Sequence, residues 1–244
     1  LVVSGWAWQG GASSGPGGAS VLLLYTLGSD RVERIIRTNP VACAYVAADE
    51  EDNIWCLGLT IDKREAGSDY ALVYKFSRAG VLLSEFFPRS LFPHRGDFGP
   101  QAGEPFRPSD IGQPELTATN DGLVRAWLPN VNTLLEWDLE GNLTSRSELP
   151  RRTSQPGHFY QVAFLPDGEP VGFVPTSDRG PQGSAASYSL FRIDRSSSRW
   201  LPLGEETPTF TQGTVFLAGA DESGVVLRDT ASNKLFWVAV SKSK

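Results

Sequence analysis

Four tight turns, each between two short apolar runs, recur along this chain and constrain its fold more than any other feature. They read ADEEDN at 48–53, TNDG at 119–122, LPDG at 165–168 and ADESG at 220–224. The order of apolar run, turn, second run and paired hairpin recurs, whereas the residues in between differ. Such an array predicts an all-β fold, and we expect a β-propeller of four-stranded antiparallel blades.

Residues 40–90 form the clearest unit. Four short runs in it, VACAYVA, IWCLGLT, YALVYKF and VLLSEFF, are rich in aromatic and β-branched residues and are separated by turn residues. This is typical of four antiparallel strands. Similar units cover about residues 1–39, 115–150, 158–204 and 213–244. We therefore expect one domain over residues 1–244, with about five visible blades.

The first and last units contain only three runs each. We expect the first unit to lack its innermost strand and the last unit to lack its outermost strand. A single stretch before Leu1 could supply both strands and close a ring of five or six blades. Because the chain begins inside an expected strand, we expect an upstream segment, and a signal peptide there would favour an extracytoplasmic location. The compartment otherwise stays open.

The charge of the chain narrows the classes of partner that we expect. The 28 acidic and 22 basic residues give a net charge of −6 at pH 7, and the basic residues are scattered. Neither nucleic acid nor an anionic membrane surface is therefore an expected partner. The longest apolar runs are far shorter than the ~20 residues of a membrane-spanning helix.

The two cysteines lie in the first two expected strands of residues 40–90. Pairing these strands places Cys43 and Cys56 on opposite faces, so we expect two buried thiols and no disulfide.

Two of the turns carry a resemblance to a known family. IWCLGL after Asp52 and Asn53, and LVRAWLP after Asp121 and Gly122, resemble the D-x-x-G-N-x-W/V turn and strand of the broad NHL-like and six-bladed propeller superfamily. As a repeat pattern the resemblance covers nearly the whole chain. It implies a propeller fold but no particular subfamily. In architecture such propellers resemble calcium- or zinc-dependent hydrolases of the lactonase kind.

Loop length distinguishes the two faces of the expected disc. One set of connections is uniformly tight, whereas the other set contains every long segment, at 9–18, 61–69, 88–114, 150–157 and 176–186. Long loops without periodicity are usually functional or mobile, so we place the binding site on the long-loop face. The inserted loop 88–114 is the strongest local candidate, as a lid or docking arm. Alternatively, and equally well, it is a structural surface loop whose own phenylalanines pack it against the protein.

These considerations lead to one expected function and two alternatives. We expect a non-enzymatic module that binds a protein or a small organic ligand on the long-loop face and needs no cofactor. The first alternative is a metal-dependent hydrolase with calcium at the central opening, in which Glu115 and Asn39 are metal ligands or Glu115 and His158 form an acid/base pair. The second is a structural module of a larger chain. The expected binding residues are Trp8, Asn39, Phe92, His94, Arg95, Asp97, Arg107, Asp110, Arg152, Tyr160 and Gln212.

Overall fold

The computed structural model is a β-propeller built from antiparallel sheets, which confirms the expected fold class. It describes residues 2–8, 18–25, 31–60, 69–88, 91, 115–129, 132–150, 161–175, 185–186, 188–206, 210–211, 215–221, 224–229, 232 and 234–240. Within these ranges no helix has the length and apolar character needed to cross a membrane.

In the described part of the chain, five sheets follow one another. The first contains β1 (Val2–Trp8), β2 (Gly18–Tyr25) and β3 (Val32–Arg37). The second contains β4 (Val41–Ala48), β5 (Ile54–Thr60), β6 (Ala71–Phe76) and β7 (Leu82–Pro88). The third contains β8 (Glu115–Ala118), β9 (Leu123–Leu128), β10 (Thr133–Asp138) and β11 (Leu143–Ser147).

The fourth sheet contains β12 (Gln161–Phe164), β13 (Pro170–Pro175), β15 (Tyr188–Asp194) and β16 (Arg199–Glu206). The fifth contains β18 (Val215–Asp221), β19 (Gly224–Asp229) and β20 (Lys234–Ala239). A separate two-stranded ribbon pairs β14 (Ala185–Ala186) with β17 (Phe210–Thr211). The four strands expected in each of the three middle units are therefore present, in their expected order.

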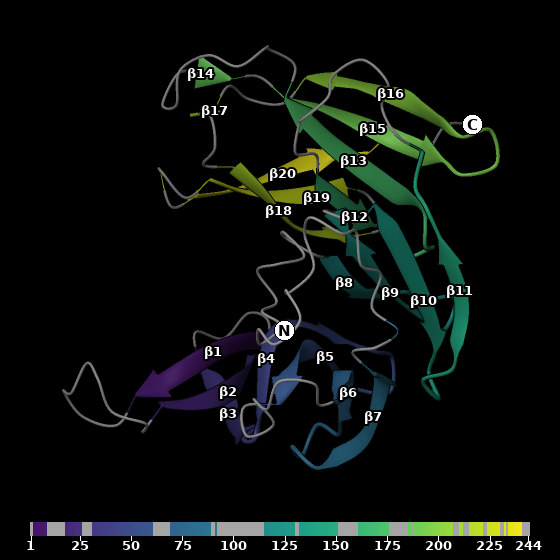
Figure 1. Ribbon diagram of the computed structural model, residues 1–244. Helices are drawn as coiled ribbons and strands as arrows, with labels where there is room; N and C mark the ends of the chain where they lie inside the picture. The colour runs from purple at the N-terminus through teal and green to yellow at the C-terminus, as the bar shows by residue number, and fades with distance from the viewer. Residues whose placement is uncertain are drawn as a thin grey trace.

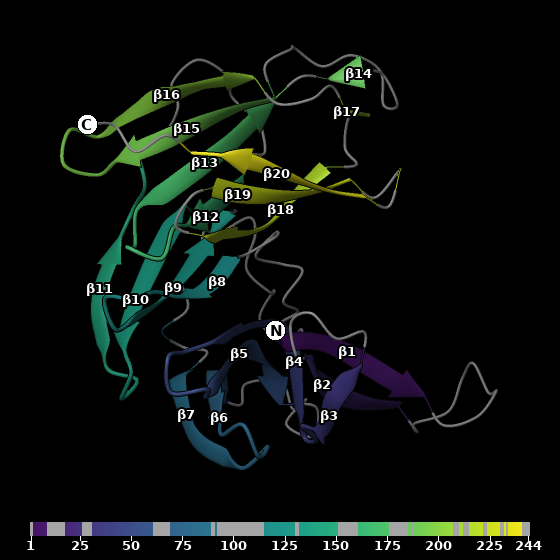
Figure 2. The ribbon, with the colours of Figure 1, turned by 180° about the vertical axis from the view of Figure 1, so that it is seen from behind.

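The sheets are arranged in an arc around a common centre (Figures 1 and 2). Along its inner side, β1 contacts β4, β4 contacts β8, β8 contacts β12 and β12 contacts β18. The strand β1 thus occupies the inner position of the first sheet, and our expectation that this unit lacks its innermost strand is wrong. The run at residues 2–8 is itself the inner strand, so the described part of this sheet ends at β3 on the outside.

Apolar clusters fill each interface between neighbouring sheets. Leu22 and Ile36 of the first sheet pack with the second, and Trp55 of the second packs in one cluster with Trp137 of the third. A third cluster, around Trp127, joins the third and fourth sheets, and a fourth joins the fourth and fifth. Strands such as β6, β9 and β10 are consequently buried on both faces, which explains their nearly continuous apolar sequences.

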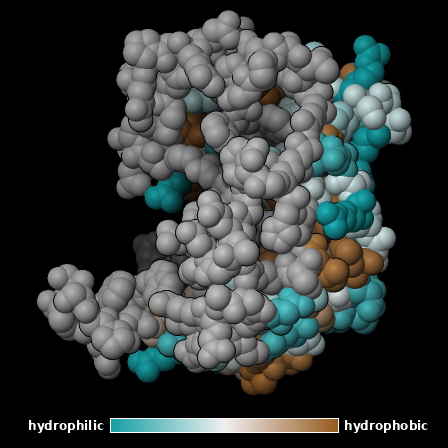
Figure 3. Space-filling view, viewed as in Figure 1, coloured by the Kyte–Doolittle hydropathy of each residue, from teal (hydrophilic) through white to brown (hydrophobic). Residues whose placement is uncertain are grey.

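Burial decreases toward the outer strands. The outer strands β3, β7, β11 and β20 are largely exposed. Some of their exposed residues are apolar, including Ile35, Leu83 and Leu235. Figure 3 shows apolar residues at the surface in the lower right of the view, the region where β7 lies in Figure 1. The inner and middle strands therefore form most of the core between the sheets, and the outer strands add single buried residues such as Ile36, Phe87 and Val238.

The tight turns share one backbone geometry. In the β4–β5, β8–β9 and β12–β13 connections, the fourth turn residue donates its amide to the carbonyl of the first. These fourth residues are Asp52, Gly122 and Gly168, with φ of 62°, 76° and 84°. Glycine adopts such positive φ values without steric cost, which is why two of the three turns end in Asp-Gly.

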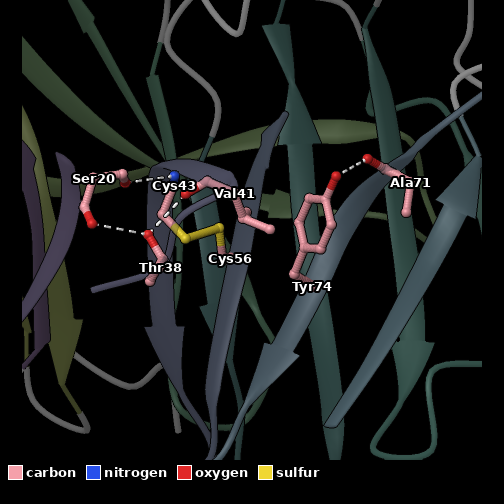
Figure 4. The surroundings of a disulfide bond; sticks show 7 residues. All are labelled: Ser20, Thr38, Val41, Cys43, Cys56, Ala71 and Tyr74. Atoms are coloured by element: carbon pink, nitrogen blue, oxygen red, sulfur yellow. Dashed lines mark hydrogen bonds between the residues drawn. A yellow bond between two sulfur atoms is a disulfide. The ribbon is translucent and has the colours of Figure 1, made fainter. Parts of the chain in front are cut away.

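The two cysteines form a disulfide, so our expectation of free thiols is wrong. Cys43 pairs with Gly58 in the β4–β5 ladder whereas Tyr45 pairs with Leu57, so Ala44 is an extra residue, a β-bulge. One extra residue reverses the alternation of faces, and Cys43 therefore lies on the same face as Cys56, with their Cα atoms 5.4 Å apart. Figure 4 shows the bond between β4 and β5.

Candidate functional site

The candidate site lies where the inner strands begin, at the end of the sheets opposite the tight turns. Glu115 is the first residue of β8, and Gln161 is the first residue of β12. Both follow long segments of the chain, as the loop analysis predicted. The residues Phe92, His94, Arg95, Asp97, Arg107, Asp110, Arg152, His158, Tyr160 and Gln212 lie outside the described residues, and Trp8 is described only as backbone in β1. Their predicted roles stay predictions.

Glu115 lies between the third and fourth sheets. Its neighbours Leu116 and Ala118 pack into the cluster that joins the third sheet to the second. Because side chains alternate along a strand, Glu115 and Thr117 lie on the other face of β8, the face toward the fourth sheet. The Glu115 side chain is partly buried there. Its carboxyl is thus at the axial end of an inner strand and faces a neighbouring blade.

The environment of Glu115 favours its neutral form. Burial raises the pKa of the carboxyl to about 8, and a hydrogen bond from the Thr117 hydroxyl, which donates to Oε1 at 3.2 Å, opposes this rise only in part. Removing a carboxylate from water disfavours its charge, because the surrounding protein solvates an ion poorly. At pH 7 the group is therefore mostly protonated, so it can donate as well as accept a hydrogen bond.

Asn39 and Gln161 make contacts between sheets at this same end. The Asn39 side-chain oxygen accepts a hydrogen bond from the Ser20 amide at 3.0 Å, which ties the start of β4 to β2. The Gln161 amide donates to the Val215 carbonyl oxygen at 3.4 Å, which links the fourth and fifth sheets. Among the described residues no group of three or more His, Cys, Asp or Glu side chains could hold a metal ion.

The tight-turn end holds an ion network that sequence reasoning missed. Arg125 on β9 donates from Nε to Glu136 Oε1 at 2.9 Å, and its two terminal nitrogens donate to Asp121. Arg195 of the fourth sheet donates to both oxygens of Glu136, at 3.0 and 2.9 Å. Burial alone would raise the pKa of Glu136, but the hydrogen bonds and charges of Arg195 and Arg125 outweigh it and hold that pKa below its usual value.

A second link at the tight-turn end joins the second and third sheets. The Lys75 ammonium donates to the Leu139 carbonyl oxygen at 2.7 Å and lies 3.6 Å from Asp49 Oδ2. It also lies 5.2 Å from the centroid of the Trp55 ring, and the indole nitrogen of Trp55 donates to Asp49 at 3.0 Å. A charged residue inside an apolar strand, as in ALVYKF, LVRAWL and TLLEWD, was the sequence signal for both links.

The two ends of the sheets differ in how their charged side chains are paired. Each nitrogen of the Arg125 guanidinium already donates to an acidic side chain, so the tight-turn network holds sheets together and is engaged internally. Among the described residues, Glu115 at the other end is hydrogen-bonded to Thr117 of its own strand and forms no ion pair. The end of the inner strands that carries Glu115 is therefore the better candidate for a ligand.

Comparison with known proteins finds solved structures of low sequence identity and low TM-score. No family model matches the chain, and no curated protein matches it in sequence. Among solved structures, virginiamycin B lyase from Staphylococcus aureus is 14% identical, with 92% of this chain and 78% of that chain covered and a TM-score of 0.39. The periplasmic gluconolactonase of Pseudomonas aeruginosa is 15% identical, with 98% and 70% covered and a TM-score of 0.37.

A thermostable family-43 glycoside hydrolase is 10% identical, with 84% of this chain and 73% of that chain covered and a TM-score of 0.37. The narrower resemblance to the NHL-like superfamily finds no matching family model and stays a prediction. The blade arrangement is thus established by the sheets of this chain, and its activity is a separate question.

Proposed function

We propose that this propeller binds a small organic ligand, without turnover, at the end of the inner strands where Glu115 lies. The observation that carries the proposal is a partly buried carboxyl that burial keeps neutral, with a hydroxyl beside it, at the axial end of β8. Ligand sites typically combine apolar walls with a few well-placed polar groups. A neutral carboxyl and a hydroxyl suit an uncharged polar ligand such as a polyol, a sugar or a lactone.

The ligand should bind more weakly in alkaline solution. A protonated Glu115 can donate to a ligand oxygen, and it loses that proton as the pH rises through its pKa of about 8. If the proton is required, the affinity falls about tenfold per pH unit above this pKa. Glu115→Gln keeps a donor and an acceptor and should remove the pH dependence while retaining binding, whereas Glu115→Ala should abolish binding.

A thermal-shift screen of polyols, sugars and lactones at pH 6, followed by calorimetry at pH 6 and pH 9, tests the proposal. Glu140→Gln is the matched control, because Glu140 is an exposed carboxyl in the tight turn after β10. A panel without a binding compound, or binding that Glu115→Ala leaves unchanged, would contradict a ligand site at Glu115.

The second candidate is a metal-dependent hydrolase of the lactonase kind. The same observation favours it, because a bound calcium ion would supply the positive charge that a buried carboxylate lacks. Lactone hydrolysis that requires calcium, stops with a chelator and is lost in Glu115→Gln would replace the first candidate. Hydrolysis without metal dependence, or no calcium binding by calorimetry, would remove it.

The disulfide supports an extracytoplasmic location for this function. Disulfides persist in oxidising compartments and are rare in the cytosol, where thiols are kept reduced. Cys43 and Cys56 are both buried within the cluster between the first two sheets. Protein binding through the long loops, including residues 88–114, is a further prediction that lies outside the described residues.

A further inference from the structure

The turn between β10 and β11 carries an acceptor motif for N-linked glycosylation. It reads EGNLT at residues 140–144. The motif requires an asparagine with serine or threonine two positions later and no proline between them. Of the seven asparagines in the sequence, only Asn142 meets this requirement. Glu140 also supplies the acidic residue, two positions before the asparagine, that the more selective enzymes of this class require.

The folded chain exposes this turn to solvent. Asn142, Leu143 and Thr144 are all exposed, and Leu143 begins β11, the outer strand of the third sheet (Figure 1). An attached oligosaccharide is bulky and hydrated, so it needs such a surface position. Because β9 and β10 are antiparallel, the β10–β11 turn lies at the same end as the β8–β9 turn. A glycan there leaves the end with Glu115 open.

The hydrogen bonds of the turn are compatible with a sugar on Asn142. Asp138 Oδ1 accepts the Asn142 backbone amide at 2.8 Å, and the Gly141 amide donates to the Asp138 carbonyl oxygen at 3.0 Å. The Asn142 side-chain nitrogen donates to Asp138 Oδ2 at 2.8 Å. This nitrogen carries two N–H groups, and a glycosylated asparagine keeps one of them. The closed turn therefore accommodates the modification without losing its own contacts.

We propose that Asn142 is an N-linked glycosylation site that is modified before β10 and β11 pair. The step joins the Asn142 side-chain nitrogen to the anomeric carbon of an oligosaccharide carried on a lipid pyrophosphate. A C–N bond forms, the C–O bond to the pyrophosphate breaks, the lipid pyrophosphate leaves, and the amide nitrogen gives up one proton to the transferase. The proposal rests on the extracytoplasmic location that the disulfide supports, and it is independent of the proposed ligand.

The order of events follows from the contacts of Thr144. In the folded chain its hydroxyl donates to the Glu136 carbonyl oxygen at 3.0 Å, across the β10–β11 pair. The Asn142 side chain is bonded to Asp138 in the same structure. A transferase has to bind the asparagine and the threonine hydroxyl together, and the closed hairpin engages both elsewhere. Modification therefore precedes the pairing of these strands, and the fold then keeps the glycan in solvent.

Secretion of the whole chain from cultured eukaryotic cells tests the site. Peptide mass spectrometry should find an oligosaccharide on Asn142 in most of the secreted protein. Asn142→Gln and Thr144→Ala should each remove the glycan, whereas Thr144→Ser should retain it because serine also carries the hydroxyl. If the chain stays inside the cells, the same analysis of the retained protein decides the question, since the transferase acts before export is complete.

Two results would overturn the proposal. Protein that has entered the secretory compartment without an oligosaccharide on Asn142 would show that the motif is not an acceptor. The order is tested with folded, unmodified chain and a membrane preparation that contains the transferase and its lipid-linked donor. We expect no modification of the folded chain and ready modification of a synthetic peptide of residues 138–146. Equal modification of both would show that the folded turn is itself the substrate, and the proposed order would be wrong.

Discussion

Replacing Glu115 by glutamine tests whether the folded protein keeps this carboxyl neutral. Its pKa of about 8 lies about 3.5 above the ordinary value of 4.5, and each unit of difference corresponds to about 1.4 kcal/mol. A raised pKa in the folded state means that its stabilising effect is fully present below pH 4.5 and is lost as the pH rises to about 8. The unfolding free energy therefore falls by at most about 5 kcal/mol as the pH rises from 4.5 to 8. About 3 kcal/mol of this decrease occurs between pH 4.5 and pH 7.

Urea denaturation of the wild type and Glu115→Gln at pH 4.5, 6, 7 and 8 measures this effect. Glutamine cannot ionise, so the difference in unfolding free energy between the two proteins isolates the Glu115 titration from all other groups. We expect the variant to gain stability relative to the wild type as the pH rises, by up to about 3 kcal/mol between pH 4.5 and pH 7. Glu140→Gln, at an exposed turn position, should run parallel to the wild type.

The refuting result is a constant difference between Glu115→Gln and the wild type across this pH range. It would mean that Glu115 titrates near 4.5 in the folded protein and that the carboxyl is solvated or paired with a cation. The proposed neutral hydrogen-bonding site would then be wrong, even if the protein bound a ligand elsewhere.

Four further substitutions, one of them a comparison variant, test the contacts within and between the sheets. Glu136→Gln should cost about 3 kcal/mol in urea denaturation at pH 7, because it removes a carboxylate from the buried guanidinium of Arg125, which is 5% exposed. Gly168→Ala should cost about 1 kcal/mol more than Gly122→Ala, since both have positive φ but only the former Cβ would meet that guanidinium, at 2.8 Å. Gly58→Ala should cost about 3 kcal/mol and change amide hydrogen exchange at the β4 bulge, because its Cβ would overlap the Ala42 carbonyl oxygen of β4.

Local chemistry made the strands and turns predictable. Asp-Gly at 121–122 and 167–168 specifies a turn with positive φ, and the structure has such a turn at both places. The position of Glu115 at the start of an inner strand followed from the long segment before it. These features depend on a few neighbouring residues, so one sequence was enough to find them.

The features that sequence reasoning missed depend on single-residue irregularities or on contacts between sheets. The bulge at Ala44 leaves the apolar pattern of β4 intact, yet it reverses the face of Cys43 and allows the disulfide. Arg125 and Glu136 are adjacent across the β9–β10 ladder, but their link to Arg195 requires the docking of two sheets. The inner position of β1 likewise became visible only when the sheets were placed around one centre.

As the pH rises, the contribution to stability of Glu136 at one end of the sheets increases, and that of Glu115 at the other end decreases. The pKa of Glu136 is lowered, so the stability it provides is present above its ordinary pKa and is lost in acid. The pKa of Glu115 is raised, so that carboxyl costs stability at neutral pH. A glutamine at position 115 would avoid this cost while keeping the hydrogen-bonding shape. The ligand that we propose at Glu115 would offset this cost, which is why we place the candidate site at this end of the sheets.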